Sequence, residues 1–376
     1  MPLLILSKLL DPLFKIRFAQ IPTRIGPLSS GFDAWVNMNR NKEEYKANLV
    51  IFAYGKNVSN PFLLSIVKKN VFAVPNFLLD PVFIAMNLFP PLKLFQTGFN
   101  EFDEHETVSQ PFTHTLSSPI RFLANEMSVE IAREVDCWNT QAPVLAICLR
   151  DKQYNESSLG ISNEYAQHRD YSIKDCKEAF EFLLQSGYSI IRAGNKGDKF
   201  QMKPDLSFFD YPNSRIVDPE NDLKLFDLSS FVIGVDTGLI ELALLMRKSV
   251  NLFNLSMFTN RLTSPLYQLV NFNTFMDTEC RQELGLQALK TRGVFTARDF
   301  YDLESMGVQI HKITPDDLVL FVQEVIDFNL GNWVQSGESK EIRDKFLFYG
   351  SEYGYKQNSH FFFPNYWAKK TAWLYS

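Results

Sequence analysis

The chain has 376 residues, 45% of them apolar and 22% charged, and its formal net charge is −5. This length predicts two domains, and the acidic balance argues against a nucleic-acid-binding protein, which would normally carry a basic stripe. Four cysteines without a CxxC pair or a histidine at ligand spacing indicate reduced, mostly buried thiols of a cytoplasmic protein and not a zinc site.

The N-terminal stretch from Met1 to Ile21 is apolar but is interrupted by Lys8, Asp11, Lys15 and Arg17. It contains no run of about 18 apolar residues and no small-residue cleavage site, so we expect neither a membrane-spanning helix nor a signal peptide. The pattern predicts an amphipathic segment that packs on the protein itself or, as the alternative, makes a peripheral membrane contact.

The first half of the chain alternates between predicted strands and helices. Arg24 and Gly26 stand in a short segment that fits a loop between a strand and a helix. A strand is predicted at Asn48–Tyr54, a helix from Asn60 to about Lys69, and another strand at Val71–Val74. This order predicts a first parallel sheet.

The domain boundary is expected in the middle of the chain. An acid-rich loop at Phe99–Gln110 contains His105, which could bind a metal ion, although a solvated loop is the simpler interpretation. A helical pattern at Thr115–Trp138 ends in the polar segment 139–143, which contains a proline. The expected domains are therefore residues 1–140 and residues 141–376.

The second half alternates more clearly and predicts an α/β fold with a doubly wound parallel sheet. Strands are expected at Val144–Leu149, Tyr188–Arg192, Arg215–Val217, Ser249–Phe253 and in the apolar stretch that begins at Phe231. Helices are expected at Ser172–Ser186, Asp222–Leu228, from Gly238 onward and at Thr314–Phe328. The aromatic tail, Phe346–Trp373, is expected either to cover an edge of the sheet or to return to the first domain.

Polar residues gather where these strands end. Arg150 and Asp151, Arg192 and Gly194, and the turn Asp236-Thr237-Gly238 all follow a predicted strand, and Arg169 lies in the long loop after the first of them. Ligands of open α/β sheets bind outside the carboxyl ends of the strands, so these residues are expected on one rim of the sheet.

The three arginines and the start of a helix are suited to hold a diphosphate. We expect Arg150, Arg169 and Arg192 to bind it together with the amides of Thr237 and Gly238. Asp236 and Glu241 are better suited to ribose or sugar hydroxyls, and Asp151 is a candidate general base. Two structural alternatives are an Arg150–Asp170 ion pair and a turn at Asp236 or Thr237 that only caps the helix.

Four motifs together resemble a known family. They are Leu149-Arg150-Asp151-x-x-Tyr154, Arg169-Asp170-Tyr171-Ser172-Ile173, Leu184-x-x-Gly187-Tyr188-x-x-Ile191-Arg192-x-Gly194 and Phe231-x-Ile233-Gly234-x-Asp236-Thr237-Gly238. This order is similar to that in bacterial glycosyltransferases of surface-polysaccharide gene clusters. Asp236-Thr237-Gly238-Leu239 also resembles the D-T-G-L element of heptosyltransferases, with Glu241 where those enzymes usually have His.

The resemblance implies a GT-B enzyme, in which two Rossmann-like domains face a cleft. It implies a nucleotide-sugar donor on the second domain, with Tyr154 and Gly194 among its contacts, and an acceptor on the first, near Arg24 and Gly26. GT-B enzymes generally need no bound metal, and no other cofactor is expected. Pro27 stands where the family usually has His, which puts a catalytic role of that loop in doubt.

The expected function is transfer of a sugar from a nucleotide donor to a surface polysaccharide, such as capsule or lipopolysaccharide, or to a lipid-linked glycan. The expected location is the cytoplasm, with a peripheral position at the inner membrane as the alternative. A nucleotide-sugar epimerase and a non-catalytic nucleotide- or glycan-binding protein stay open as other functions.

Overall fold

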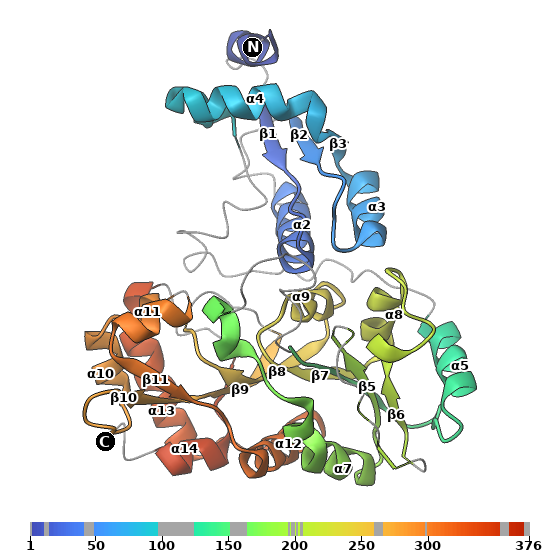
Figure 1. Cartoon of the computed structure of the whole chain (residues 1–376), viewed down its shortest axis with the longest axis vertical. Helices are drawn as coiled ribbons and strands as arrows, with labels where there is room; N and C mark the ends of the chain where they lie inside the picture. Colours follow the sequence, from blue (N-terminus) through green and yellow to red (C-terminus); the bar gives the residue numbers. More distant parts are fainter. Residues whose placement is uncertain are drawn as a thin grey trace. The chain divides into compact units, whose positions relative to one another are not determined.

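The computed structural model describes residues 2–10, 15–40, 49–96, 124–150, 164–194, 196, 200, 202–203, 206–258, 266–297, 299–353 and 361–371. Contacts divide these residues into two compact units, the first ending by residue 96 and the second present from residue 124 onward (Figure 1). Helix α5 (Ala124–Glu134) packs against α8 (Asn221–Leu228). The second unit therefore begins earlier than the boundary at residue 140 that the sequence suggested. The predicted acidic loop at residues 99–110 lies outside the described residues.

The first unit contains a three-stranded parallel sheet in the order β1-β2-β3. Its elements are α1 (Pro2–Leu10), β1 (Ile16–Gln20), α2 (Ile25–Arg40), β2 (Leu49–Tyr54), α3 (Pro61–Asn70), β3 (Phe72–Pro75), α4 (Asn76–Leu88) and η1 (Pro90–Phe95). Asn60 caps α3, because its Oδ1 accepts a hydrogen bond of 2.8 Å from the Leu63 N–H, and Pro61 occupies the first helical position. The predicted strands and helix of this region are confirmed.

The prediction of one amphipathic segment at Met1–Ile21 is wrong for its second part. Pro2–Leu10 forms a helix, whereas Ile16–Gln20 is the first strand, paired in parallel with β2. Phe18 and Ala19 are fully buried, and burial of these residues outweighs the polar interruptions that suggested a surface segment. No helix among the described residues is both long enough and apolar enough to cross a bilayer.

The second unit contains a six-stranded parallel sheet in the order β6-β5-β4-β7-β8-β9. Its strands are β4 (Val144–Cys148), β5 (Ser189–Ala193), β6 (Phe208–Asp210), β7 (Phe231–Gly234), β8 (Ser249–Leu255) and β9 (Tyr267–Phe272). Every neighbouring pair is parallel. In chain order this is the 3-2-1-4-5-6 arrangement of the Rossmann fold. The α/β class and the doubly wound parallel sheet are confirmed.

The helices cover both faces of this sheet. Helices α7 (Lys177–Gln185) and α12 (Pro315–Asn329) pack together on one face, and α8 and α9 (Gly238–Leu245) lie on the other (Figure 1). The other elements are η2 (Glu164–Arg169), η3 (Ile173–Cys176), η4 (Tyr211–Asn213), β10 (Thr274–Asp277), α10 (Leu286–Thr291), η5 (Val294–Thr296), α11 (Phe300–Ser305), β11 (Val308–His311), α13 (Gly337–Gly350), η6 (Ser351–Tyr353) and α14 (Asn365–Thr371).

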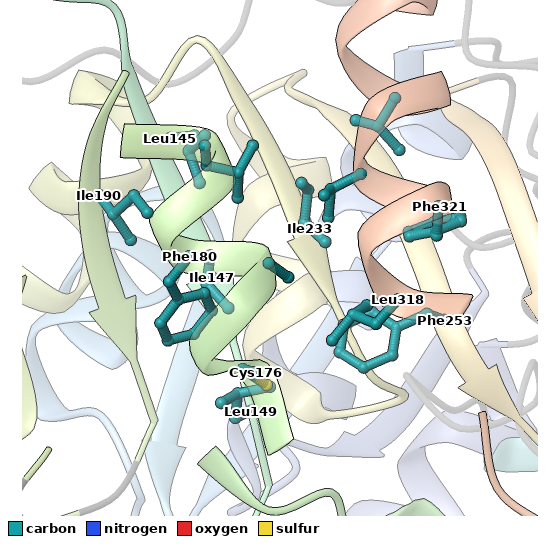
Figure 2. Packing of buried hydrophobic residues seen from close by; sticks show 14 of the residues in the cluster. Leu145, Ile147, Leu149, Cys176, Phe180, Ile190, Ile233, Phe253, Leu318 and Phe321 are labelled. Carbon is teal, nitrogen blue, oxygen red and sulfur yellow. The ribbon is translucent and has the colours of Figure 1, made fainter. Parts of the chain in front are cut away.

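The core of the second unit follows from the alternation of residues along β4. Leu145, Ile147 and Leu149 point to the face covered by α7 and α12, where they belong to one buried cluster with Phe180 of α7 and Phe321 of α12 (Figure 2). α12 begins as predicted, because the Thr314 hydroxyl accepts a hydrogen bond from the Asp317 N–H and Pro315 opens the helix.

The strand predicted at Arg215–Val217 is wrong. These residues form a loop in which Arg215 and Val217 are exposed, and the second strand outward from β4 is β6 at Phe208–Asp210. Phe208 and Phe209 are both buried, so this three-residue strand is stabilised by its aromatic side chains.

The aromatic tail covers the β9 edge of the sheet. The Phe362 N–H donates to the Gln268 carbonyl at 2.7 Å, and the Val270 N–H donates to the Phe362 carbonyl at 2.9 Å. Phe346 and Phe363 pack beside Phe272 in a buried aromatic cluster. Of the two alternatives for the tail, coverage of a sheet edge is therefore the one observed.

Candidate functional site

The candidate site is the point in the second sheet where the strand order reverses. From β4 the chain continues outward to β5 and β6, and it then crosses to β7 on the other side of β4. β4 ends at Cys148 and β7 ends at Gly234, so Arg150 and Asp236 each lie two residues beyond a strand end. In doubly wound sheets this crevice is the preferred place for a ligand.

Two glycines allow the backbone to come close together here. A Cβ atom on Gly234 would lie 2.7 Å from the Cys148 carbonyl oxygen, and one on Gly194 would lie 3.0 Å from that of Leu149. Gly194 also has a φ of +146°, which disfavours a side chain. The close approach to the end of β4 is thus one reason why position 194 requires glycine. The donor contact predicted from sequence is a separate, functional reason.

Arg150 is held by Asp170. Its Nε lies 3.1 Å from Asp170 Oδ1, and each side chain is only 6% exposed. The structural alternative considered for Arg150 is therefore present. A buried ion pair of this kind fixes both side chains, and removing either one leaves an uncompensated charge.

Arg169 and Asp236 form the second ion pair and link the two sides of the switch point. Arg169 Nη1 lies 3.5 Å from Asp236 Oδ2, and both side chains are 17% exposed. The pair is longer and more accessible than the Arg150–Asp170 pair. Because Arg169 and Asp170 are consecutive, one short segment connects Arg150 at the end of β4 with Asp236 at the end of β7.

Helix α9 begins directly after this pair. Thr237 occupies the N-cap position with extended dihedral angles, and its side chain makes no capping hydrogen bond with a described residue. Gly238 opens the helix and Glu241 lies in its first turn, half-buried. The structural alternative in which the Thr237 side chain only caps α9 is therefore not supported.

Arg192 belongs to a different environment. Its Nε donates to Asp210 Oδ1 on β6 at 2.6 Å, and the side chain is buried. Asp210 also accepts hydrogen bonds from the Phe200 N–H and from Asn213 Nδ2. Arg192 Nη2 has no hydrogen-bond partner among the described residues. The structure thus gathers Arg150 and Arg169 with Asp170 and Asp236, whereas Arg192 is paired one strand further out.

The segment that carries Arg169 is anchored by residues that the sequence did not single out. Lys312 Nζ donates to the Asp170 carbonyl at 2.6 Å and to the Gln167 carbonyl at 3.2 Å. The carbonyl of buried His168 accepts from Asn254 Nδ2 at 3.4 Å and from Ser256 Oγ at 3.3 Å. These contacts hold Arg169 at the switch point from two separate parts of the chain.

Asn254 has an unusual backbone. Its φ is +58°, in the left-handed region, although it is a fully buried asparagine at the end of β8. Asparagine tolerates this region better than most residues, and such strain is retained where the surroundings require it. We found no local sequence signal for Lys312 or Asn254, because their partners lie far away in the chain.

The two buried cysteines near the site are poor nucleophiles. Burial raises the pKa of the Cys148 thiol. Burial, followed by the charge of Asp175, also raises the pKa of Cys176 well above its ordinary value, while Arg192 lowers it. Thiolate chemistry needs the opposite shift, so neither residue is suited to covalent catalysis. The prediction of buried thiols is confirmed for these two, whereas Cys280 is exposed.

Several predicted residues stand apart from this geometry. Asp151 and Tyr154 lie outside the described residues, so their roles stay predictions. In the first unit, Arg24 is exposed after β1 and Gly26 is buried in the first turn of α2, where its carbonyl accepts from the Ser29 and Ser30 hydroxyls. Among the described residues, no three His, Cys, Asp or Glu side chains are placed to hold a metal ion.

No protein-family model matches the sequence, and no curated protein matches it. Solved structures show a partial likeness. ADP-heptose lipopolysaccharide heptosyltransferase II of Escherichia coli is 12% identical, with 64% of this chain and 84% of that chain covered and a TM-score of 0.39. A glycosyl transferase family 9 protein from Veillonella parvula is 10% identical, with coverages of 64% and 80% and a TM-score of 0.39. The Escherichia coli heptosyltransferase WaaC with ADP is 11% identical, with coverages of 63% and 86% and a TM-score of 0.29. Likeness at this level does not assign an activity to this chain.

Proposed function

We propose that this chain is a glycosyltransferase that takes a sugar from a nucleotide-sugar donor bound at the switch point between β4 and β7. The observation that carries the proposal is the Arg169–Asp236 pair, which joins the two strand ends beside the first turn of α9. A cation and a helix N-terminus at the switch point of a Rossmann sheet are suited to a nucleotide diphosphate.

Arg169 is the arginine best placed to contact the diphosphate. Its pair with Asp236 is partly exposed and 3.5 Å long, so an incoming diphosphate can replace the carboxylate as its partner. Arg150 is more deeply buried and held at 3.1 Å by Asp170, so its proposed role is to position the Asp170–Arg169 segment. Arg192, paired with Asp210, is proposed to act further from the reacting bond.

The chemistry requires stabilisation of a leaving group. In the reaction the bond between the anomeric carbon and the diphosphate oxygen breaks, a bond to an acceptor hydroxyl forms, and that hydroxyl loses its proton. Negative charge builds on the nucleoside diphosphate, and Arg169 with the amides at the start of α9 would stabilise it. This scheme needs no metal ion, in line with the GT-B resemblance.

Asp236 has a second role in this scheme. A carboxylate facing a diphosphate is repelled by it, so release from Arg169 would leave Asp236 to accept hydrogen bonds from ribose or sugar hydroxyls. Glu241, one turn into α9, is proposed for the same type of contact. Asp151, which directly follows Arg150, remains the candidate base for the acceptor hydroxyl.

The acceptor is proposed to be a surface-polysaccharide or lipid-linked glycan. This part of the proposal rests on the family resemblance of the motifs, which also associates Arg24 and Gly26 with the acceptor side.

A donor-turnover assay tests the proposed activity. The purified chain is incubated with ADP-, GDP-, UDP- and CDP-sugars, and both nucleotide release and sugar configuration are followed. Slow release of one nucleoside diphosphate, absent in the Asp236→Asn variant, is the expected result. Inversion of the sugar without release would indicate an epimerase, and tight binding with neither reaction would indicate a binding protein. Either of these outcomes would overturn the transferase proposal.

A further inference from the structure

Exposed apolar side chains are concentrated in the first unit. Of the 17 large hydrophobic residues that are exposed among the described residues, ten belong to this smaller unit. Nine of the ten lie on α1, on α4 or on the segment from Phe89 to Leu94. Monomeric soluble proteins rarely concentrate exposed apolar side chains in one region unless that region binds something.

The exposed residues of α4 follow the helical period. Phe77, Ile84 and Leu88 lie on one face, with Ile84 58% and Leu88 69% exposed. The opposite face, represented by Val82 and Met86, is buried in the core of the unit. Asp80, three residues after Phe77 and four before Ile84, is exposed on the same face. The exposed side of α4 is therefore mainly apolar with one acid, and the opposite side packs against the core.

The neighbouring elements extend this apolar face. Leu4 of α1 and Phe95 of η1 belong to the same core cluster as α4, and η1 contacts both helices. On their outer sides, α1 exposes Leu6 and Leu9 and η1 exposes Leu94. We call the outer sides of α1, α4 and η1 the apolar face.

The charge of this region indicates what covers the apolar face. Residues 1–96 contain eleven Lys and Arg against five Asp and Glu, although the whole chain has a net charge of −5. Lys8 of α1 and Lys93 of η1 are exposed beside the apolar side chains, and Asp80 is the exposed acid on α4. Basic residues flanking an apolar surface are complementary to an anionic bilayer, whose headgroups attract lysine while side chains such as leucine insert below them.

We propose that the apolar face is a docking surface for an anionic lipid bilayer. The protein would lie on the membrane through Leu9, Ile84, Leu88 and Leu94, with Lys8 and Lys93 at the headgroups. This surface includes α4 and η1 and is thus wider than the N-terminal segment alone. The inference does not depend on the proposed glycosyl transfer.

Vesicle co-sedimentation of the full chain tests this surface. With vesicles of phosphatidylcholine and phosphatidylglycerol, most of the protein is expected in the pellet, and with phosphatidylcholine alone much less. The double variant Ile84→Ser/Leu88→Ser is expected to bind at least about tenfold more weakly, because two apolar insertions are lost. The double variant Leu330→Ser/Val334→Ser, which changes exposed apolar residues of the second unit, is the matched control and should bind like the wild type.

Charge and self-association provide two further readouts. Lys8→Gln/Lys93→Gln should weaken binding to the anionic vesicles and leave the small binding to phosphatidylcholine unchanged. Equal binding of wild type and Ile84→Ser/Leu88→Ser to anionic vesicles would overturn the proposal. It would also be overturned if the wild type stays in the supernatant and sediments in free solution as a dimer that the same variant abolishes, since a second copy would then cover the apolar face.

Discussion

The two units use the same parallel βα construction but place their apolar side chains differently. In the second unit, aromatic rings interlock around Phe258, Phe272 and Phe346, and the helices on both faces of the sheet bury apolar side chains. In the first unit, three strands support α1 and α4, and much of their apolar surface remains exposed. The second unit is therefore organised around its interior and the first around a surface.

Amino-acid composition alone does not show whether apolar side chains fill a core, as in the second unit, or lie on a surface, as in the first. A high content of phenylalanine and leucine predicts a large core, but the same residues on a three-stranded sheet exceed what its core can bury. The candidate site residues of the two units differ as well, since Arg150 of the second unit is buried whereas Arg24 of the first is exposed. Matched substitutions in the two units test this contrast.

The largest effect is expected at the aromatic cluster. Phe258 is 2% exposed and packs at 4.7 Å from the ring centroids of both Phe272 and Phe295. Phe258→Ala should lower the free energy of unfolding by about 4 kcal/mol, since a large cavity is left in a rigid core. Phe77→Ala, at an exposed position of α4, should change it by less than about 0.5 kcal/mol. Denaturant unfolding measures both values, and equal losses would contradict the contrast between the units.

A somewhat smaller effect is expected at the buried ion pair. Arg150→Met removes the partner of Asp170 and should lower the free energy of unfolding by about 3 kcal/mol, because a carboxylate remains in a buried position. Arg24→Met, at an exposed arginine of the first unit, should be nearly neutral. If Arg150→Met leaves the free energy of unfolding unchanged, the Arg150–Asp170 pair does not hold the segment that carries Arg169.

The smallest effect is a change in acid sensitivity. The N–H groups of Cys280 and then Glu279 donate to Asp277 and lower the pKa of its carboxyl, and Arg292 lowers it further. Because the folded pKa is below the unfolded one, this stabilisation is present above the unfolded pKa and is lost as the pH falls through the folded pKa. Asp277→Asn should therefore lose stability at neutral pH and show a shallower decline in acid. Thermal unfolding of the wild type and of Asp277→Asn between neutral and acid pH measures the two slopes, and equal slopes would contradict this role of Asp277.

Much of the second sheet could be predicted from sequence because its strands are short apolar runs between clear turns. β4, β5, β7 and β8, and the cap of α12, follow local rules of pattern and capping. β1 could not be predicted because polar residues interrupt its apolar pattern, and β6 because it has only three residues. Both strands form because they pair with a neighbouring strand and bury their side chains. The strand-end rule also predicted a common rim for the arginines.

Their partners could not be predicted from local sequence. Asp236 reaches Arg169 only through the crossing of the chain at the switch point, and Lys312 reaches Asp170 across 142 positions. The separation of Arg192 from Arg169 has the same origin, because a strand end specifies the rim but not the neighbour with which a side chain pairs.

Titration calorimetry with nucleoside diphosphates tests the central claim most directly. ADP, GDP, UDP and CDP are titrated into the wild type, Arg169→Gln and Arg281→Gln, the last at an exposed arginine outside the six-stranded sheet. We predict that at least one diphosphate binds the wild type and Arg281→Gln equally. Its affinity for Arg169→Gln should fall about 10- to 100-fold, the loss expected for one charge-assisted contact. Absence of binding by all four, or equal affinity for Arg169→Gln, would contradict a nucleotide site at the switch point between β4 and β7.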